Sequence, residues 1–475
     1  MSHYDQLANI PFPGGYPSKP SIQQLKDELV FQRAVQSYLW ALPVLNMYGM
    51  KEGSEKAFGS GYNVLPIFKD RLNAKTLVTT PNSDVIYAMG YVDLKDDGPL
   101  VIEVPPGLQG ILDDFFQRPI CSERPIEGRT WCGDVGLPGP DHGNGAKYLL
   151  LPPDYQGPIP EDFLTFRSRT YGVFVFWRGF FKDPKQLQEP VGVMEQTKIY
   201  PLGKESSAKP MQFPNASATP ANLLYATDGT AFDVLARFIE HEYADPADRE
   251  MRGMLATLGI VKGQKFEPDA HMRNLLELAA RTATHIGHGT SYDPSPTLTN
   301  GYWYEGRQWV NVFPGNATFS GDTFNYIDPR TGFFSYAYST SPGMAASMVN
   351  VGAKYPTTYK DANGEFLMGD NRYQLHLPKD VPAALFWSVT AYDSLTASGL
   401  DNGQAFPSIN TMDKPAMNAD GSTDIYFGPE APANGTKNWI RTVQGRGFFV
   451  ILRLYGPTQR FFDRAWVPSD VEKSK

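Results

Sequence analysis

The sequence has little cysteine and no long apolar run. Only Cys121 and Cys132 occur among 475 residues, which excludes a disulfide framework, and no C-x-x-C metal motif is present. One disulfide across the short loop between the two cysteines stays open. A transmembrane helix needs roughly 20 apolar residues, whereas the apolar stretch "GFFVILRLYG" includes Arg453. We therefore expect no membrane insertion.

The N-terminal segment also lacks the apolar centre of a secretory signal. It reads "MSHYDQLANIPFPGGYPSKP", with several prolines in place of an apolar run. The sequence as given therefore predicts a cytoplasmic protein, and a secreted one if a leader has been removed.

Positive charge is outweighed and scattered. The chain has 43 Lys and Arg against 51 Asp and Glu, a formal net charge of −8, and no basic block. Binding of nucleic acid or of an anionic membrane surface requires clustered Lys and Arg. The composition therefore excludes these partners and favours a small-molecule ligand, with a homo-oligomer left open.

The common catalytic signatures are missing. The sequence contains no G-x-S-x-G elbow, no H-E-x-x-H and no Walker A loop. His285 and His288 lie three residues apart near a predicted helix end, where they would either hold a metal or favour the helix C-terminus. Because no third ligand is close in sequence, we expect no metal and no cofactor.

The abundance of turn-forming and aromatic residues predicts a mainly β protein with a helical minority. There are 44 Gly and 40 Pro, and aromatic residues make up 13%. Helical spacing of apolar residues appears over residues 21–42, where Ser21 and Gln24 fit a capping box and Pro43 is expected to end or kink the helix. It appears again in three segments between residues 220 and 287.

Candidate strands occupy two other regions of the chain. In the first they are "VIYAMGYVDL", "GPLVIEVP", "AKYLLLPP" and "YGVFVFWRGF"; in the second they are "FFSYAYST", "NRYQLHLP", "ALFWSVTAYD", "TDIYFGP" and "GRGFFVILRLYGP". We expect an N-terminal helical lead-in (1–70), a first β-sandwich of jelly-roll type (71–215), a helical connecting segment (216–300) and a second such sandwich (301–475).

Polar side chains stand at the start of one strand, in "TTPNSDVIYA". Asn82 and Asp84 would either cap a turn or line a site. Residues two apart on an extended chain face the same way, and the same face continues with Ile86 and Ala88. A polar pair leading onto an apolar floor is typical of a ligand cleft, so we expect Asn82 and Asp84 to line a pocket.

A second polar cluster follows in "GILDDFFQRP", where Asp113 and Asp114 stand close to Arg118. A guanidinium keeps a neighbouring carboxylate ionised, and the pair would orient a substrate or form a surface ion pair. If the strands "VIYAMGYVDL" and "GPLVIEVP" pair as a meander, this cluster and the Asn82–Asp84 pair lie at related ends of one sheet.

Aromatic residues surround an arginine in "YWYEGRQW". Tyr304, Arg307 and Trp309 would bind a ring, a sugar or a carboxylate, or form a strand edge with one side in the core. The remaining candidates lie on strands. His376 would act as a general base or be structural, and Tyr87 and Tyr392 would contact the ligand.

Long blocks of this sequence resemble a paired family, domain of unknown function 1254 followed by domain of unknown function 1214. The first half does so through "TPNSDVIYAMGYVDLKDDGPLVIEVP", "ILDDFFQRPI" and "GPDHGNGAKYLLLPPDY", and the second through "FWSVTAYDSLTASGLDNGQAFPS", "DGSTDIYFGPEAP" and "NWIRTVQGRGFFVILRLYGP". The resemblance implies two β-sandwiches with helices before and between them, and no established reaction.

The chain departs from the family pattern at several positions. It has Val85 where the family tends to have Thr, Ala397 where the family tends to be basic, and His142 and Asn144 in a block that usually carries more lysine. If these positions face the site, the lost positive groups argue against an anionic ligand.

These features together predict a metal-independent hydrolase or lyase for a small organic molecule. Asp84, Asp114 and His376 are its candidate acid–base residues, with Asn82, Tyr87, Arg118, Tyr304, Arg307, Trp309 and Tyr392 as candidate substrate contacts. The alternative is a binding protein for a carbohydrate-like or other small molecule without turnover.

Overall fold

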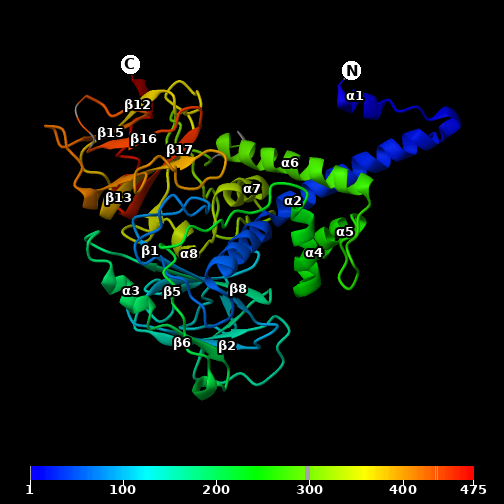
Figure 1. Ribbon diagram of the computed structural model, residues 1–475, viewed down its shortest axis with the longest axis horizontal. Coiled ribbons are helices and arrows are strands. Elements are labelled where there is room, and N and C mark those ends of the chain that lie inside the picture. Colours follow the sequence, from blue (N-terminus) through cyan, green and yellow to red (C-terminus); the bar gives the residue numbers. More distant parts are fainter. Residues whose placement is uncertain (1, 295–299, 434, 436, 475) are drawn as a thin grey trace.

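Two β-domains and a group of helices make up the fold. The computed structural model describes residues 2–294, 300–433, 435 and 437–474, so the expected boundary near residue 300 falls beside residues outside the description. Helix accounts for 27% and strand for 24% of the chain, and the expected mixture of β-sheets with helices is confirmed. Figure 1 shows the first β-domain below the second, with the long helices extending to the right of both.

The first β-domain contains nine strands. They are β1 (Ile86–Asp93), β2 (Leu100–Val104), β3 (Gln109–Asp114), β4 (Cys121–Ser122), β5 (Asp134–Gly136), β6 (Ala146–Leu151), β7 (Leu164–Arg167), β8 (Gly172–Gly179) and β9 (Lys198–Pro201). They form two sheets, in the orders β1-β8-β3-β5 and β4-β7-β6-β2-β9. Apolar side chains from both sheets, such as Trp177 and Tyr148, share one core, so the sheets form a sandwich.

The second β-domain repeats this plan. Its strands are β10 (Ala353–Lys354), β11 (Thr357–Thr358), β12 (Arg372–Leu377), β13 (Ala383–Asp393), β14 (Ser408–Asn410), β15 (Thr423–Gly428), β16 (Trp439–Arg441), β17 (Phe448–Pro457) and β18 (Glu472–Ser474). The sheets β10-β17-β13-β14 and β16-β15-β12-β18 enclose a common core, with β11 also paired to β17. The alternation visible in the sequence is the alternation of core and outer faces.

The helices of eight or more residues lie mostly between the two β-domains in sequence. They are α2 (Lys19–Phe58), α4 (Ala231–His241), α5 (Arg249–Thr257), α6 (Ala270–Tyr292) and α7 (Ile327–Tyr336). The shorter helices are α1 (His3–Ala8), α3 (Gln188–Met194), α8 (Pro342–Ala345) and α9 (Gln459–Phe462). Among the described residues, no helix combines the length and apolar character needed to span a membrane.

Helix α2 differs from the sequence expectation at both ends. It begins after the cap residue Ser18 instead of Ser21, and it runs through Pro43 without ending there. A proline inside a helix costs about 3 kcal/mol, but the residues around Pro43 are buried against α4, α6 and α7. This tertiary packing outweighs the local penalty.

The segment "FFSYAYST" is also not a strand. Its first residues belong to α7, where every residue from Thr331 to Tyr336 is buried. Burial on all sides removes the alternation or helical spacing that identifies an element from sequence. Helix α6 likewise continues beyond residue 287, where the helical spacing in the sequence ends, to Tyr292.

The outer face of the β1-β8-β3-β5 sheet is buried as well. Tyr87, Met89 and Tyr91 of β1 and Phe174 and Phe176 of β8 pack with the apolar residues of α2 and α4 in one core. This sheet is therefore covered by its partner sheet on one face and by helices on the other. The covering of this outer face positions the candidate site described below.

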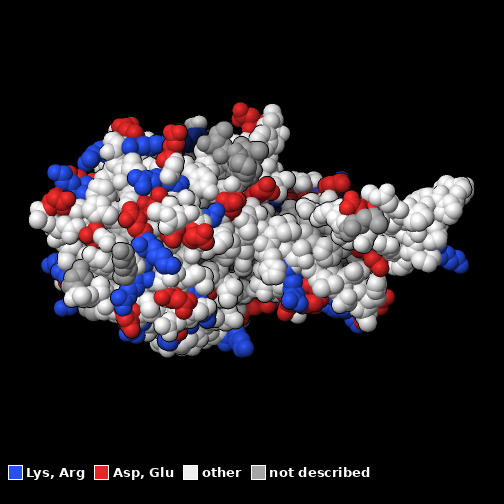
Figure 2. Space-filling model, turned by 90° about the horizontal axis from the view of Figure 1, so that it is seen from above, with Lys and Arg blue, Asp and Glu red and all other residues white. Residues whose placement is uncertain are grey.

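The surface carries both charge signs. Figure 2 shows Lys and Arg interspersed with Asp and Glu over the face in view, together with the narrow extension formed by the N-terminal part of the chain. Along this extension, Tyr4 and Tyr16 are 77% and 80% exposed.

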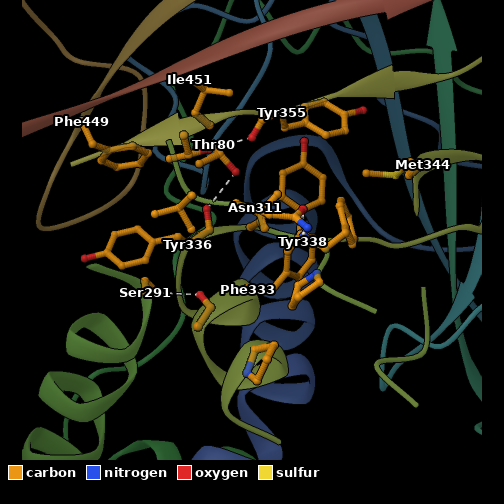
Figure 3. A pocket seen from close by; sticks show the side chains of 18 of the residues that line it. Thr80, Ser291, Asn311, Phe333, Tyr336, Tyr338, Met344, Tyr355, Phe449 and Ile451 are labelled. Atoms are coloured by element: carbon orange, nitrogen blue, oxygen red, sulfur yellow. Dashed lines mark hydrogen bonds between the residues drawn. The ribbon is translucent and has the colours of Figure 1, made fainter. Parts of the chain in front are cut away.

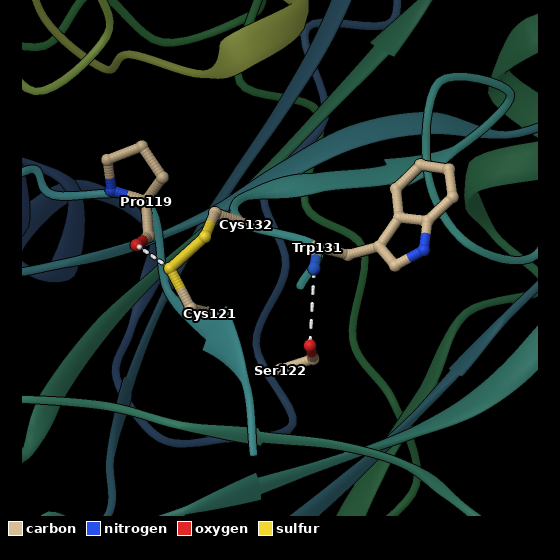
Figure 4. Close-up of a disulfide and its surroundings, with 5 residues drawn as sticks. All are labelled: Pro119, Cys121, Ser122, Trp131 and Cys132. Carbon is tan, nitrogen blue, oxygen red and sulfur yellow. Dashed lines mark hydrogen bonds between the residues drawn. A yellow bond between two sulfur atoms is a disulfide. The ribbon is translucent and has the colours of Figure 1, made fainter. Parts of the chain in front are cut away.

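Cys121 and Cys132 form a disulfide that closes a loop with a sequence separation of 11. Figure 4 shows it beside the backbone carbonyl of Pro119 and next to Trp131, whose amide donates a hydrogen bond to Ser122. The pairing that the sequence left open is thus made in the structure. Disulfides are rare in reducing compartments, so the pairing does not favour the expected cytoplasmic location.

Replacing both cysteines by serine should lower the free energy of unfolding by about 3 kcal/mol. Without the crosslink the unfolded chain has more conformational entropy, which for a loop of this length is worth about that free energy. Urea unfolding of wild type and variant measures the difference. Wild type in reductant should unfold like the variant, and the variant should not respond to reductant. A wild-type protein purified with two free thiols would contradict the pairing.

Candidate functional site

A cavity lies where the two β-domains and the helices meet. Its volume is about 130 Å³. Its walls come from the outer face of β1 and β8, the outer face of β17, helices α6 and α7, and the segment around Asn311. Figure 3 shows Phe449 and Ile451 on one side, Tyr355 and Met344 on another, and Phe333 with Ser291 below.

Strand β17 contributes one wall through its outer face. Phe449, Ile451, Arg453 and Tyr455 line the cavity, whereas the residues between them belong to the core of the second sandwich. The period of two along the strand produces this division. Arg453 is therefore a charged side chain on an otherwise apolar and aromatic wall, and it is only 3% exposed.

Strands β1 and β8 form the facing wall. Tyr87 and Arg178 are directly paired across these antiparallel strands, and both line the cavity together with Phe176. The rings of Tyr87 and Phe176 lie 5.0 Å apart, and the Arg178 guanidinium lies 5.1 Å from the Phe176 ring. This wall therefore also combines aromatic rings with one guanidinium.

The segment between α7 and α8 closes the cavity between these walls. Tyr338 of this segment lines it, together with Tyr336 at the end of α7 and Met344 in α8. Thr80 donates a hydrogen bond of 2.8 Å to the carbonyl of Tyr336, drawn in Figure 3, and so ties this segment to the chain before β1. The Tyr338 ring packs 5.6 Å from that of Phe176.

The two arginines of the cavity are not neutralised by carboxylates. Arg178 donates to the sulfur of Met344 at 2.9 Å, and its Nε is sealed from solvent without a hydrogen-bond partner. Arg453 donates to Thr390 and to the carbonyl of Thr80, each at 3.3 Å. Within the described residues, neither guanidinium forms an ion pair. Both therefore retain an unpaired positive charge.

Arg178 and Arg453 both act on the pKa values of the same tyrosines. Burial raises the pKa of Tyr87 to about 12, while Arg178 and Arg453 act to lower it. The pKa values of Tyr338 and Tyr455 are also raised by burial and opposed by both arginines. The two guanidiniums therefore converge on one group of hydroxyls. Asp134 also interacts with Arg178, but it accepts a bond from the Gly343 amide and is not ion-paired with the arginine.

The stretch "TTPNSDVIYA" touches the cavity wall through one residue and lines it through three. Asn82 accepts a hydrogen bond from the Asp84 amide at 2.9 Å, as in an Asx turn, and its side-chain nitrogen donates to the hydroxyl of Tyr455. Thr80, Val85 and Tyr87 line the cavity directly. Asn82 thus both shapes a turn and holds a residue of the opposite wall.

Asp84 lies outside the cavity lining, in a buried contact between the two β-domains. It is 0% exposed, and Arg71 and Asn410 donate to its Oδ1 at 3.1 and 2.8 Å, while Ser408 donates to its Oδ2 at 3.0 Å. This arrangement fixes the carboxylate as a connector between β1 and β14.

Asp84→Asn should therefore lower the free energy of unfolding by about 3–5 kcal/mol, because it leaves the buried Arg71 without its counter-charge. Ligand affinity of the folded protein should stay within about twofold, by the same local reasoning. Chemical unfolding and calorimetric binding measure the two effects. A variant of unchanged stability with lost binding would instead place Asp84 in the site.

A second buried carboxylate holds the segment that carries Tyr338. Asp113 is 0% exposed and accepts bonds from the Ser339 hydroxyl at 2.7 Å and the Thr340 amide at 3.1 Å, whereas its other oxygen has no partner. Gln117 accepts from the Ser339 amide at 2.5 Å and donates to the carbonyl of Pro43. Burial raises the pKa of Asp113 to about 8.

This raised pKa predicts a pH dependence of stability. Between the unfolded pKa of about 3.9 and the folded value, the folded chain holds a proton that the unfolded chain has lost, so stability falls as pH rises. Asp113→Asn imitates the protonated acid and should flatten the unfolding midpoint between about pH 5 and pH 8. A wild-type stability that rises across this window, with the same slope in the variant, would contradict the assignment.

Asp114 and Arg118 pair with each other at 2.7 Å, as the sequence suggested. They lie far from the cavity. The expected meander does not form, because β1 pairs with β8 and not with β2. Asp114 of β3 and Val92 of β1 both pair with Val173 of β8. Asp114 therefore lies level with Val92, near the C-terminal end of β1. At about 3.3 Å per residue, this cluster stands about 26 Å along the sheet from Asp84, and the meander hypothesis is wrong.

Of the other predicted site residues, only Tyr87 lines the cavity. His376 on β12 pairs with Asp424 at 2.7 Å on the far sheet of the second domain. Trp309 and Tyr304 are buried in that domain's core, and Arg307 points to Asp470 at 3.5 Å. Tyr392 is fully buried and donates to the carbonyl of Pro81 at 2.6 Å.

Arg178 and Arg453 were the residues that sequence reasoning missed. Each interrupts an apolar strand, in "YGVFVFWRGF" and "GFFVILRLYG", on the face opposite the sandwich core. A charged residue in a strand whose two faces are both apolar is costly to bury. Such a residue can therefore be taken from the sequence as a candidate site residue.

No group of three or more His, Cys, Asp or Glu suited to a metal occurs in the part of the chain that the structure describes. His288 stacks on Tyr336 with ring centres 4.8 Å apart, and burial lowers the pKa of its imidazole to about 4. It is a neutral packing residue beside the cavity.

Comparison with known families identifies the two β-domains. Residues 62–201 match "Protein of unknown function (DUF1254)", and residues 352–459 match "Protein of unknown function (DUF1214)". The chain belongs to the paired DUF1254/DUF1214 family. This confirms the resemblance inferred from the sequence, and neither description names an activity.

One solved structure supports the fold of this DUF1254/DUF1214 protein. The VPA0106 protein from Vibrio parahaemolyticus is similar with a TM-score of 0.53 and 17% identity, over 95% of this chain and 100% of that one. An uncharacterised protein from Burkholderia cenocepacia aligns with a TM-score of 0.38 and 14% identity, over 99% and 98% of the two chains. No curated protein matches the chain.

Proposed function

We propose that this protein binds a small organic molecule in the cavity between its two β-domains. The observation that carries the proposal is the composition of the walls, which are mainly aromatic and aliphatic with a few convergent polar groups. Such a lining is typical of ligand sites, and sites of this kind form preferentially at domain junctions.

The size of the cavity limits the ligand. A cavity of about 150 Å³ accepts a benzene molecule, and this one has a volume of about 130 Å³. The ligand is therefore about one ring in size. The aromatic side chains around it, such as Tyr87, Phe176 and Tyr338, provide flat surfaces for such a ring.

Binding has more support here than turnover. The predicted acid–base residues Asp84, Asp114 and His376 are engaged in contacts elsewhere. Among the described residues of the lining, the only carboxylate side chain is that of Asp328, an exposed residue. Hydrolase or lyase chemistry therefore stays a prediction, and the described residues of the lining do not include its proposed acid–base residues.

Filling the cavity tests the proposal. Val85 lines it and is 1% exposed, so Val85→Phe should occupy the space that a ring would take. Single-ring probes (phenol, benzyl alcohol, benzoate and cyclohexanecarboxylate) are screened by thermal shift. At about 100 times its Kd a probe stabilises the wild type by about 2.7 kcal/mol, and Val85→Phe should abolish this gain.

Val349→Phe is the matched control, because Val349 is 40% exposed outside the cavity, and it should respond like wild type. Ala337→Leu is a second filling variant, for the case that Val85→Phe folds poorly. If no probe stabilises the wild type, or if the filled variants bind as well as the control, the cavity is not the binding site.

A further inference from the structure

Two arginines that form no ion pair with a described residue share the cavity described above. Arg453 is almost fully buried on β17, and Arg178 lines the same cavity from β8 with one nitrogen sealed and unpartnered. Transferring a charge from water into a protein interior carries a large penalty unless the charge is paired. Elsewhere in this chain the buried Arg71 has such a partner in Asp84. The absence of a partner at the cavity therefore requires an explanation.

We infer that the ligand of the cavity is a small organic anion, a ring carrying a carboxylate, whose negative group is held by Arg178 and Arg453. This inference rests on the proposed function and names the chemical class of its ligand. A guanidinium presents several N–H donors in a planar fork that matches a carboxylate. The cavity volume restricts the apolar part of such a ligand to about one ring.

Tyr455 supplies a third donor to the same position. Its hydroxyl oxygen accepts a hydrogen bond from the side-chain nitrogen of Asn82. Asn82 is fixed in that orientation because its own oxygen accepts from the Asp84 amide. The hydroxyl hydrogen of Tyr455 is therefore not used by Asn82 and is free to donate into the cavity. Asn82 is thus a positioning residue for this donor.

The positions at which the chain departs from its family do not oppose an anion. His142 and Asn144 lie on a loop of the first domain, where His142 pairs with Glu127 at 3.1 Å, and neither lines the cavity. Ala397 does not line it either. Only Val85 does, and it replaces a neutral residue. The positive charge of the site comes from Arg178 and Arg453.

Benzoate and benzamide form the decisive probe pair, because they are nearly identical in shape and differ in charge. Calorimetry on the full chain should show that benzoate binds at least about tenfold more tightly, as charge-assisted hydrogen bonds require. Arg178→Met and Arg453→Gln should each weaken benzoate at least about tenfold and change benzamide by less than about threefold. Arg307→Gln, at an exposed arginine, should bind both probes like wild type.

Stability of the unliganded protein separates this role from a structural one. Arg178 is half-buried and forms no ion pair with a described residue. Removing such a charge relieves its desolvation penalty, so Arg178→Met should raise or preserve the urea midpoint while benzoate affinity falls. A lower midpoint, with benzoate affinity unchanged in the folded fraction, would assign Arg178 to the fold and overturn the inference.

Tyr455→Phe keeps the ring and removes the donor, so it should weaken benzoate by about five- to tenfold. An unchanged affinity would remove Tyr455 from the anion site. If both probes bind equally and both are lost in Val85→Phe, the cavity binds its ligand without charge selection, and the anion inference fails while the proposed function stands. If wild type binds neither these probes nor the other rings, the proposed function itself fails.

Discussion

The burial of one sheet on both faces is the constraint on which the rest of the structure depends. The sheet β1-β8-β3-β5 has apolar and aromatic residues on each side. The second sheet of the sandwich packs on its inner face, whereas helices have to bury its outer face. Buried residues of the C-terminal half of α2 share one core with this face, and α2 also contacts α4 and α6.

The cavity lies where this cover passes from helices to the second β-domain. Two sheets and a helical segment meet there, and their side chains do not fill the space between them completely. A packed interior usually leaves few voids larger than a water molecule. This cavity is such a void. Several tyrosines surround it, together with two guanidiniums that form no ion pair with a described residue.

Buried polar contacts set how the two β-domains face one another. Asp84 links the start of β1 to β14, Asp113 holds the segment after α7, and Asn82 holds Tyr455. Apolar contacts would allow many relative placements, whereas hydrogen bonds require specific directions. These connections are made by residues next to those that line the cavity, so they fix the distance between its walls.

The sequence by itself determined the family, the two β-domains and most of the strands, because alternation along a strand is a local property of the chain. It also pointed to the start of β1, where Tyr87 lines the cavity and Asn82 supports its wall. Tertiary structure decided the rest. Pro43 continues a helix, and residues 331–336 belong to one, because distant segments bury them. Arg178 and Arg453 are visible in the sequence, but whether a charge is paired depends on carboxylates that other strands bring, or fail to bring, into contact.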